Sequence, residues 1–154
     1  MRNRLLPQSV DNTYRGHKLA LWLFGLLLLM KTAIGLRSIF DGYTVARSAD
    51  GIPLETFSPD AARTVVSLFS LLGVTHVIFA LLGVLILVRY RALVPLMLAL
   101  LLMEHLGKRL VLHFVPVAGM GAPSATVVGL VFIVAMAAGL ALSLWSRPDP
   151  PSPA

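Results

Sequence analysis

The sequence predicts an all-α integral membrane protein, a four-helix bundle with its N- and C-termini on the cytoplasmic side. Hydrophobic residues make up 57% of the 154-residue chain and charged residues only 13%. A soluble domain carries about 25% charged residues, so we expect lipid to be the main solvent of this chain. Four apolar stretches, each at least as long as the roughly 20 residues that cross a bilayer, predict a single transmembrane domain over residues 1–154.

The first predicted helix covers residues 17–40. Its apolar core LALWLFGLLLLM is followed by Lys31 and Arg37 in the second half. The apolar stretch resumes after Lys31 and no small-residue cleavage site follows directly, so we interpret it as an uncleaved helix and not as a signal peptide.

A polar loop of residues 41–57 leads to the second predicted helix, residues 58–88. Serine suits the N-cap, proline the first helical position and aspartate the positive end of the helix dipole. The tripeptide Ser58-Pro59-Asp60 therefore predicts the start of this helix.

The third and fourth predicted helices cover residues 92–114 and 124–146. A tight basic turn, Arg89-Tyr90-Arg91, precedes the third helix, and Ser124 suits the N-cap of the fourth, which carries no charged residue up to Trp145. The proline-rich residues 147–154 predict a disordered tail.

The distribution of basic residues predicts the orientation. Lysine and arginine are enriched on the cytoplasmic side of membrane proteins. The basic N-terminal segment, the Arg89–Arg91 turn and Arg147 fall on one side, whereas the acidic loop 41–57 falls on the other. We therefore expect a multi-pass protein of a bacterial inner membrane with cytoplasmic termini. The net charge of +6 fits contact with anionic membrane lipids, and we expect no nucleic-acid partner.

Ionisable residues inside the third predicted helix point to a site. A charge at a helix centre in the bilayer costs at least about 2.5–3.5 kcal/mol, so such residues normally face the bundle interior. At a rise of 1.5 Å per residue, Glu104 should lie level with the middle of the other helices. We expect it to pair with Lys31 of the first helix and with Lys108, four residues farther along its own helix. The predicted buried polar network is Lys31, His76, Glu104 and His105, with Lys108 as the i+4 partner.

Positive charge exceeds negative charge in the outer half of the predicted bundle. Arg37, Lys108 and Arg109 lie there, against the positive-inside rule, so we expect a role other than topology. One interpretation is a pocket in which these three residues bind an anionic group, such as a lipid phosphate or a carboxylate. The other is structural, with Arg109 bonded to loop carbonyls or extended toward the interface.

The same residues suggest alternative functions, which include haem binding, acid–base catalysis and transport. His76 and His105, at matching depth, could hold a b-type haem through two imidazoles, but a hydrogen-bonded core histidine is the favoured interpretation of each, and we expect no cofactor. Neighbouring Glu104 and His105 could act as an acid–base pair. There is no cysteine and no HExxH or GxSxG motif, so we expect no metal site and favour a non-enzymatic role. A small dimeric transporter is a further alternative.

Small residues at helical spacing predict close helix contacts. They form the ridge Ala135-x-x-x-Gly139-x-x-x-Ser143 in the fourth predicted helix, with Gly73 and Gly83 in the second. Such ridges allow close approach either within one chain or between two copies of a homo-oligomer.

The layout as a whole resembles the small four-helix inner-membrane proteins of bacteria, including DoxX-like proteins. It shares with them internal termini, a longer first outer loop and a tight basic inner turn. The resemblance implies a four-helix fold and an association with quinone-linked redox complexes. From residues and layout together we expect a protein that binds a lipid or other anionic amphiphile, or that serves as an accessory subunit of a membrane complex.

Overall fold

The computed structural model describes residues 12, 14, 16–49, 51–116 and 123–145. Within these residues the chain forms only helices and their connections, with no strand. The predicted tail 147–154 and Arg147 lie outside the described residues, as does the side chain of Ser124. The predicted all-α class is therefore confirmed for the part of the chain that the structure describes.

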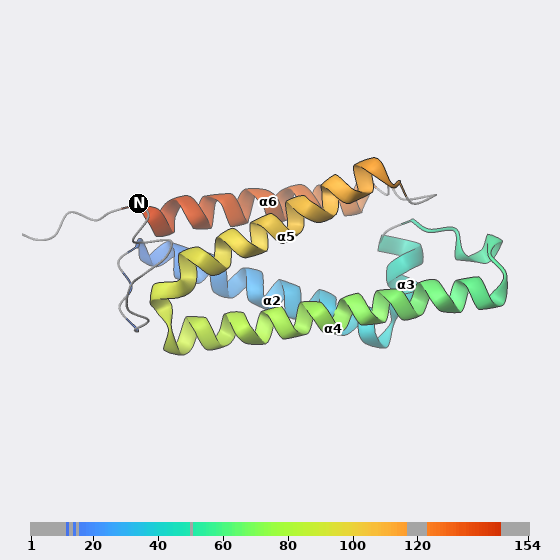
Figure 1. Cartoon of the computed structure of the whole chain (residues 1–154), viewed down its shortest axis with the longest axis horizontal. Coiled ribbons are helices and arrows are strands. Elements are labelled where there is room, and N and C mark those ends of the chain that lie inside the picture. The colour runs from blue at the N-terminus through green and yellow to red at the C-terminus, as the bar shows by residue number, and fades with distance from the viewer. Residues whose placement is uncertain (1–11, 13, 15, 50, 117–122, 146–154) are drawn as a thin grey trace, which may run out of the picture.

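The described residues include four long helices (Figure 1). Each begins and ends within two residues of its predicted bounds. They are α2 (Lys18–Phe40), α4 (Pro59–Arg89), α5 (Val94–Phe114) and α6 (Pro123–Leu144).

The start of α4 follows the chemistry of its first residues. The Ser58 hydroxyl accepts a hydrogen bond from the Ala61 backbone N–H at 3.3 Å, and Pro59 occupies the first helical position. This cap satisfies one of the N–H groups that have no partner within the helix. The N-cap predicted at Ser58 is confirmed.

The segment between α2 and α4 is more ordered than the predicted polar loop. It contains the short turns α3 (Gly42–Thr44), η1 (Val45–Ala49) and η2 (Leu54–Thr56), of which η1 is a π-helix. Its apolar residues pack on the first turns of α4, which extend past the end of α2 (Figure 1). The cluster is formed by Ala46, Ile52 and Leu54, covered by Phe57, Val65, Val66 and Phe69.

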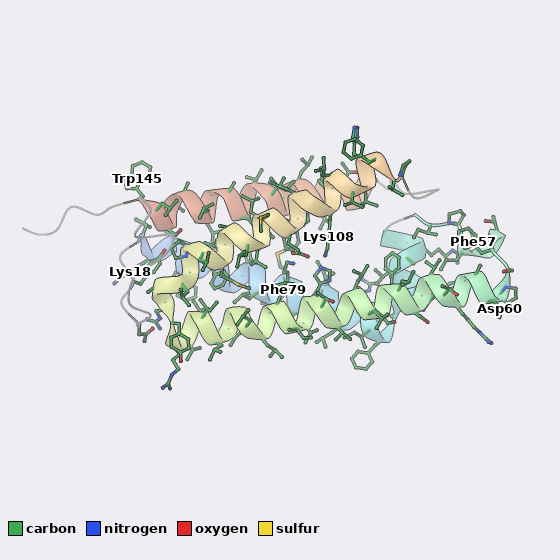
Figure 2. All side chains as sticks on the ribbon, in the orientation of Figure 1. Lys18, Phe57, Asp60, Phe79, Lys108 and Trp145 are labelled. Atoms are coloured by element: carbon green, nitrogen blue, oxygen red, sulfur yellow. The ribbon has the colours of Figure 1, made fainter. Side chains whose placement is uncertain are left out.

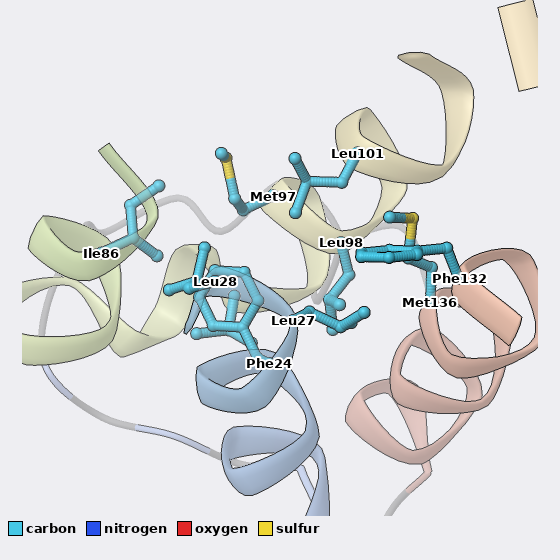
Figure 3. Close-up of a cluster of buried hydrophobic side chains, with 10 residues drawn as sticks. Phe24, Leu27, Leu28, Ile86, Met97, Leu98, Leu101, Phe132 and Met136 are labelled. Carbon is cyan, nitrogen blue, oxygen red and sulfur yellow. The ribbon is translucent and has the colours of Figure 1, made fainter. Parts of the chain in front are cut away.

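Helix α2 lies at the centre of the bundle, packed against both α4 and α6, while α5 packs mainly against α6. A short turn, η3 (Arg91–Leu93), joins α4 to α5, and α5 then runs diagonally away from α4 (Figure 1). The halves of the helices nearer the turn between α4 and α5 enclose the hydrophobic core drawn in Figure 3. Its fully buried members include Phe24, Leu28, Met97, Leu98, Leu101 and Met136.

Glycines set how closely α4 approaches α2. A Cβ added at Gly73 would lie 2.6 Å from the Gly35 carbonyl oxygen, and one at Gly83 would lie 2.2 Å from a methyl group of Leu28. Real Cβ atoms do not make contacts this short, so the two backbones meet closely at Gly73, and the Leu28 side chain packs directly on the α4 backbone at Gly83. On α6, Gly139 lies against Leu98, so this part of the small-residue ridge is used within the chain.

A hydrogen bond joins the start of α2 to the end of α6. The His17 backbone N–H donates a 3.1 Å hydrogen bond to the Leu142 carbonyl oxygen, and the Tyr14 hydroxyl lies 3.4 Å from the His17 carbonyl oxygen. Burial raises the pKa of Tyr14 to about 12, since the phenolate is disfavoured away from water. The start of α2 and the end of α6 therefore lie at the same end of the molecule.

Three of the described helices are long and apolar enough to cross a membrane, namely α2, α4 and residues Thr126–Leu144 of α6. Their outer faces are largely apolar and exposed, which fits a lipid environment. The fourth predicted crossing, α5, has 21 residues but carries three charged side chains, so its length and composition alone do not identify it as a span.

Candidate functional site

The site lies along one stripe of α5. The first half of this stripe is apolar and the second half is ionisable. The inner half of the stripe consists of Val94, Met97, Leu98 and Leu101, all buried in the core. At 100° per residue, the ionisable residues of the outer half continue along the same side of the helix. They are Glu104, His105, Lys108 and Arg109, all partly buried. The ionisable side of α5 therefore faces the other helices.

Glu104 stands between two lysines. Its Oε2 atom lies 2.5 Å from the Lys31 Nζ of α2, and its Oε1 atom forms an ion pair with the Lys108 Nζ, four residues along α5. The sequence predicted these two pairs, and both are present. Charge-assisted contacts of this kind are among the stronger hydrogen bonds in proteins. The carboxylate thereby ties α5 to α2 across the middle of the bundle.

His76 of α4 completes this cluster. Its Nε2 atom lies 3.1 Å from the Lys108 Nζ and 3.8 Å from Glu104 Oε1. Because the ammonium is the donor, the imidazole accepts at Nε2 and carries its proton on Nδ1. Figure 2 shows Lys108 extending from α5 toward α4. We call Lys31, His76, Glu104 and Lys108 the carboxylate cluster.

The two lysines differ in their access to solvent or lipid headgroups. The Lys31 side chain is 4% exposed and that of Lys108 is 40% exposed. With the imidazole neutral, the cluster holds two positive charges and one negative charge. Lys31 is enclosed with its carboxylate partner, so the excess charge is available at Lys108.

His105 and Arg109 face a different neighbour, α6. The His105 ring stacks on Phe132 with 5.9 Å between ring centroids and 16° between planes. The Arg109 Nη2 donates a 3.1 Å hydrogen bond to the Thr126 carbonyl oxygen in the first turns of α6. A Cβ at Gly129 would lie 2.6 Å from Nη2, so a larger residue there would shift the guanidinium from this position. The polar arc of α5 is thus divided between two interfaces.

Two predicted members of the site, Arg37 and His105, lie apart from the carboxylate cluster. Arg37 is exposed, because its neighbours Gly35 and Ser38 occupy the side of α2 that packs on α4. No contact among the described residues joins Arg37 to Lys108 or Arg109, so their predicted grouping stays a prediction. Of the predicted buried network, His105 stacks on α6 while the other three members meet at Glu104.

The contacts of the two central histidines do not favour the haem alternative. His76 lies against Lys108 and Glu104, whereas His105 stacks on Phe132, so the two rings face different helices. Two axial ligands would need both imidazoles directed at one point between them. Among the described residues no group of three or more histidines and carboxylates has the arrangement of a metal site.

A shallow open groove of about 760 Å³ runs along α5 where this helix meets α6. Sequence reasoning missed this groove and the residues of α6 that contact Arg109, because a single sequence does not show which helix lies beside which face. The one available sign was the glycine at 129 in an otherwise bulky apolar run. The groove is lined by Ala99, Leu102, Met103, Leu106, Leu110 and Leu140, with Arg109 and His113 at its outer end.

Comparisons with protein-family models, with curated proteins and with solved structures found no match to this chain.

Proposed function

We propose that this chain is a four-span protein of a bacterial inner membrane with cytoplasmic termini, in which α5 is the additional crossing. The polar side of α5 is turned toward α2, α4 and α6, so its charges need not meet acyl chains. The adjacent ends of α2 and α6, joined by the His17–Leu142 hydrogen bond, fit an even number of crossings. The layout keeps its resemblance to DoxX-like proteins as a working proposal.

Single cysteines test this topology cleanly, because the chain has none of its own. A cysteine at Val115, directly after α5, should react with a membrane-impermeant maleimide in intact cells. One at Ala92, in the turn before α5, should react only after the membrane is opened. Equal labelling at both positions in intact cells would overturn the four-span arrangement.

The proposed function is the binding of an anionic amphiphile in the outer half of the bundle. One observation carries it: Lys31, Lys108 and Arg109 extend into the helix interfaces, and Glu104 is the single carboxylate among them. Lys31 is enclosed and neutralised, whereas Lys108 is partly exposed, and among the described residues the acceptor of Arg109 is the Thr126 carbonyl oxygen. Lys108 and Arg109 are therefore left to attract an anion. Because both lie within a membrane protein, the anions nearest to them are the headgroups of membrane amphiphiles.

Native mass spectrometry of the protein in a mild detergent tests this proposal. Wild-type protein should retain phosphatidylglycerol in preference to phosphatidylcholine when offered both. The double variant Lys108→Gln/Arg109→Gln should lose at least about tenfold of that affinity, as expected when charge-assisted hydrogen bonds are removed. The matched control is Arg47→Gln, which removes an exposed loop cation paired with Glu55. Equal retention by the control and the double variant would contradict the proposal.

A role as an accessory subunit of a membrane complex is compatible with this binding. The redox and transporter alternatives draw on the same carboxylate cluster, and no further contact among the described residues favours them. A colourless preparation without bound iron or quinone would leave the lipid-binding proposal as the simpler one.

A further inference from the structure

We infer that the groove between α5 and α6 is the seat of one membrane phospholipid, with its anionic headgroup at Arg109 and His113 and an acyl chain along the groove. This inference rests on the proposed function, and it names the ligand class and its position. The lining of the groove, its length and the charge at its outer end point to this ligand.

The lining of the groove is suited to a hydrocarbon chain. Apart from its outer end it presents only apolar side chains, and Met103, Leu106 and Leu110 are 64%, 47% and 58% exposed. Gly107 adds a gap in this surface, because nothing lies within 4 Å of the place where its Cβ would be. A flexible apolar chain can fill such an irregular surface.

The groove is long enough to hold an acyl chain across one leaflet. Its lining runs from Ala99 to His113, fourteen residues along α5. At 1.5 Å per residue this is roughly 21 Å, compared with about 15 Å for half of a ~30 Å hydrocarbon core. A chain anchored at the outer end of the groove would therefore reach the middle of the bilayer within it.

The outer end of the groove is cationic. The guanidinium of Arg109 donates to Thr126 near the start of α6, and four of its five N–H groups remain for other acceptors. His113 lies one turn farther out on the same side of α5 and is exposed. The positive end of the α6 dipole adds to the local potential. Phosphate is the headgroup chemistry that matches a guanidinium fork beside a second donor.

A second copy of this chain is the competing occupant of an exposed apolar groove. Two copies meeting along the groove would bring their Arg109 guanidinium groups together, and among the described residues the groove lining contains no carboxylate to neutralise them. Like charges at an interface oppose association. The charges therefore favour an anionic lipid.

The test separates headgroup from chain. Delipidated protein is titrated with dioleoyl phosphatidylglycerol and with the short-chain dihexanoyl form, and binding is followed by native mass spectrometry. Arg109→Gln should weaken binding of both lipids at least about tenfold. Ala99→Phe, which fills the inner end of the groove, should weaken binding of the dioleoyl form while leaving the dihexanoyl form unchanged. The matched control is Leu81→Phe on the exposed face of α4, which should alter neither.

Each alternative outcome has a distinct meaning. If wild-type protein shows no preference for phosphatidylglycerol over phosphatidylcholine, the proposed function itself fails. If that preference exists and is lost in Lys108→Gln but survives in Arg109→Gln and Ala99→Phe, the function stands and the groove is overturned as its location. If Ala99→Phe converts a dimer to a monomer without changing lipid binding, the occupant is a second copy and the inference is wrong.

Discussion

Glu104→Gln is the most informative single change, because it removes the carboxylate shared by Lys31 and Lys108. At the 2.5 Å separation of Glu104 Oε2 and Lys31 Nζ, an effective dielectric of about 20 gives roughly 6–7 kcal/mol of gross attraction. Desolvation offsets part of this, and breaking a buried pair from one side costs about 3–5 kcal/mol in practice. We therefore expect the free energy of unfolding to fall by about 3–5 kcal/mol.

Burial decides which lysine accounts for the loss. Lys31 is 4% exposed, so it cannot reach water when its partner is removed. Lys108 is 40% exposed and can turn its ammonium group outward. Replacing the buried lysine as well, in Lys31→Met/Glu104→Gln, should recover most of the lost stability. Lys108→Gln alone should cost no more than about 1 kcal/mol, the scale of exposed pairs.

Equilibrium unfolding in mixed micelles, with all variants under one set of conditions, measures these differences. The loss of unfolding free energy in Lys31→Met/Glu104→Gln is compared with the sum of the losses in Lys31→Met and Glu104→Gln. Because the two residues are in direct contact, the two losses are not expected to add. Arg47→Gln is the matched control, since its partner Glu55 is 3.6 Å away and both side chains are more than half exposed. A loss below about 1 kcal/mol in Glu104→Gln, or additive effects of the two changes, would refute the reasoning.

The remaining predictions concern packing and the chain ends. Gly73→Ala places a methyl group 2.6 Å from the Gly35 carbonyl oxygen and should lower the free energy of unfolding by about 1–3 kcal/mol, whereas Gly107→Ala, with open space around it, should be neutral or slightly stabilising in the same unfolding assay. Tyr14, whose pKa burial raises to about 12, favours the folded state while its phenol is neutral. The unfolded value is about 10, so this contribution is complete below pH 10 and is lost as the pH rises toward 12. Ultraviolet titration should show a phenolate transition near pH 12 that disappears in Tyr14→Phe; a transition near 10 for this residue would contradict the assigned burial.

Features that depend on position along one helix were predictable. The N-cap at Ser58 follows from local chemistry, and the helix bounds follow from apolar lengths. The Lys31–Glu104 pair was predictable because both residues fall near the middle of their helices, and depth follows from a constant rise per residue.

Features that depend on which helix lies beside which face were not predictable. Arg37 lies at a suitable depth for the basic group but on the exposed side of α2. Arg109 and His105 turn to α6, although an angular count of α5 alone could not assign them a partner. The turns within residues 41–57 were missed because their apolar residues are buried only by contact with the start of α4.

The charged second half of α5 also affects how this helix is inserted into the membrane during synthesis. Each charge at a helix centre adds about 2.5–3.5 kcal/mol to the insertion cost on a translocon scale, and α5 carries Glu104, Lys108 and Arg109. In the four-span arrangement this helix should leave the translocon poorly as a single segment. Its carboxylate meets Lys31 on α2, which is synthesised earlier, while Arg109 meets α6, which is synthesised last. We therefore expect α5 to settle in the membrane only once α6 has emerged, so that nascent chains truncated before α6 leave α5 accessible to water.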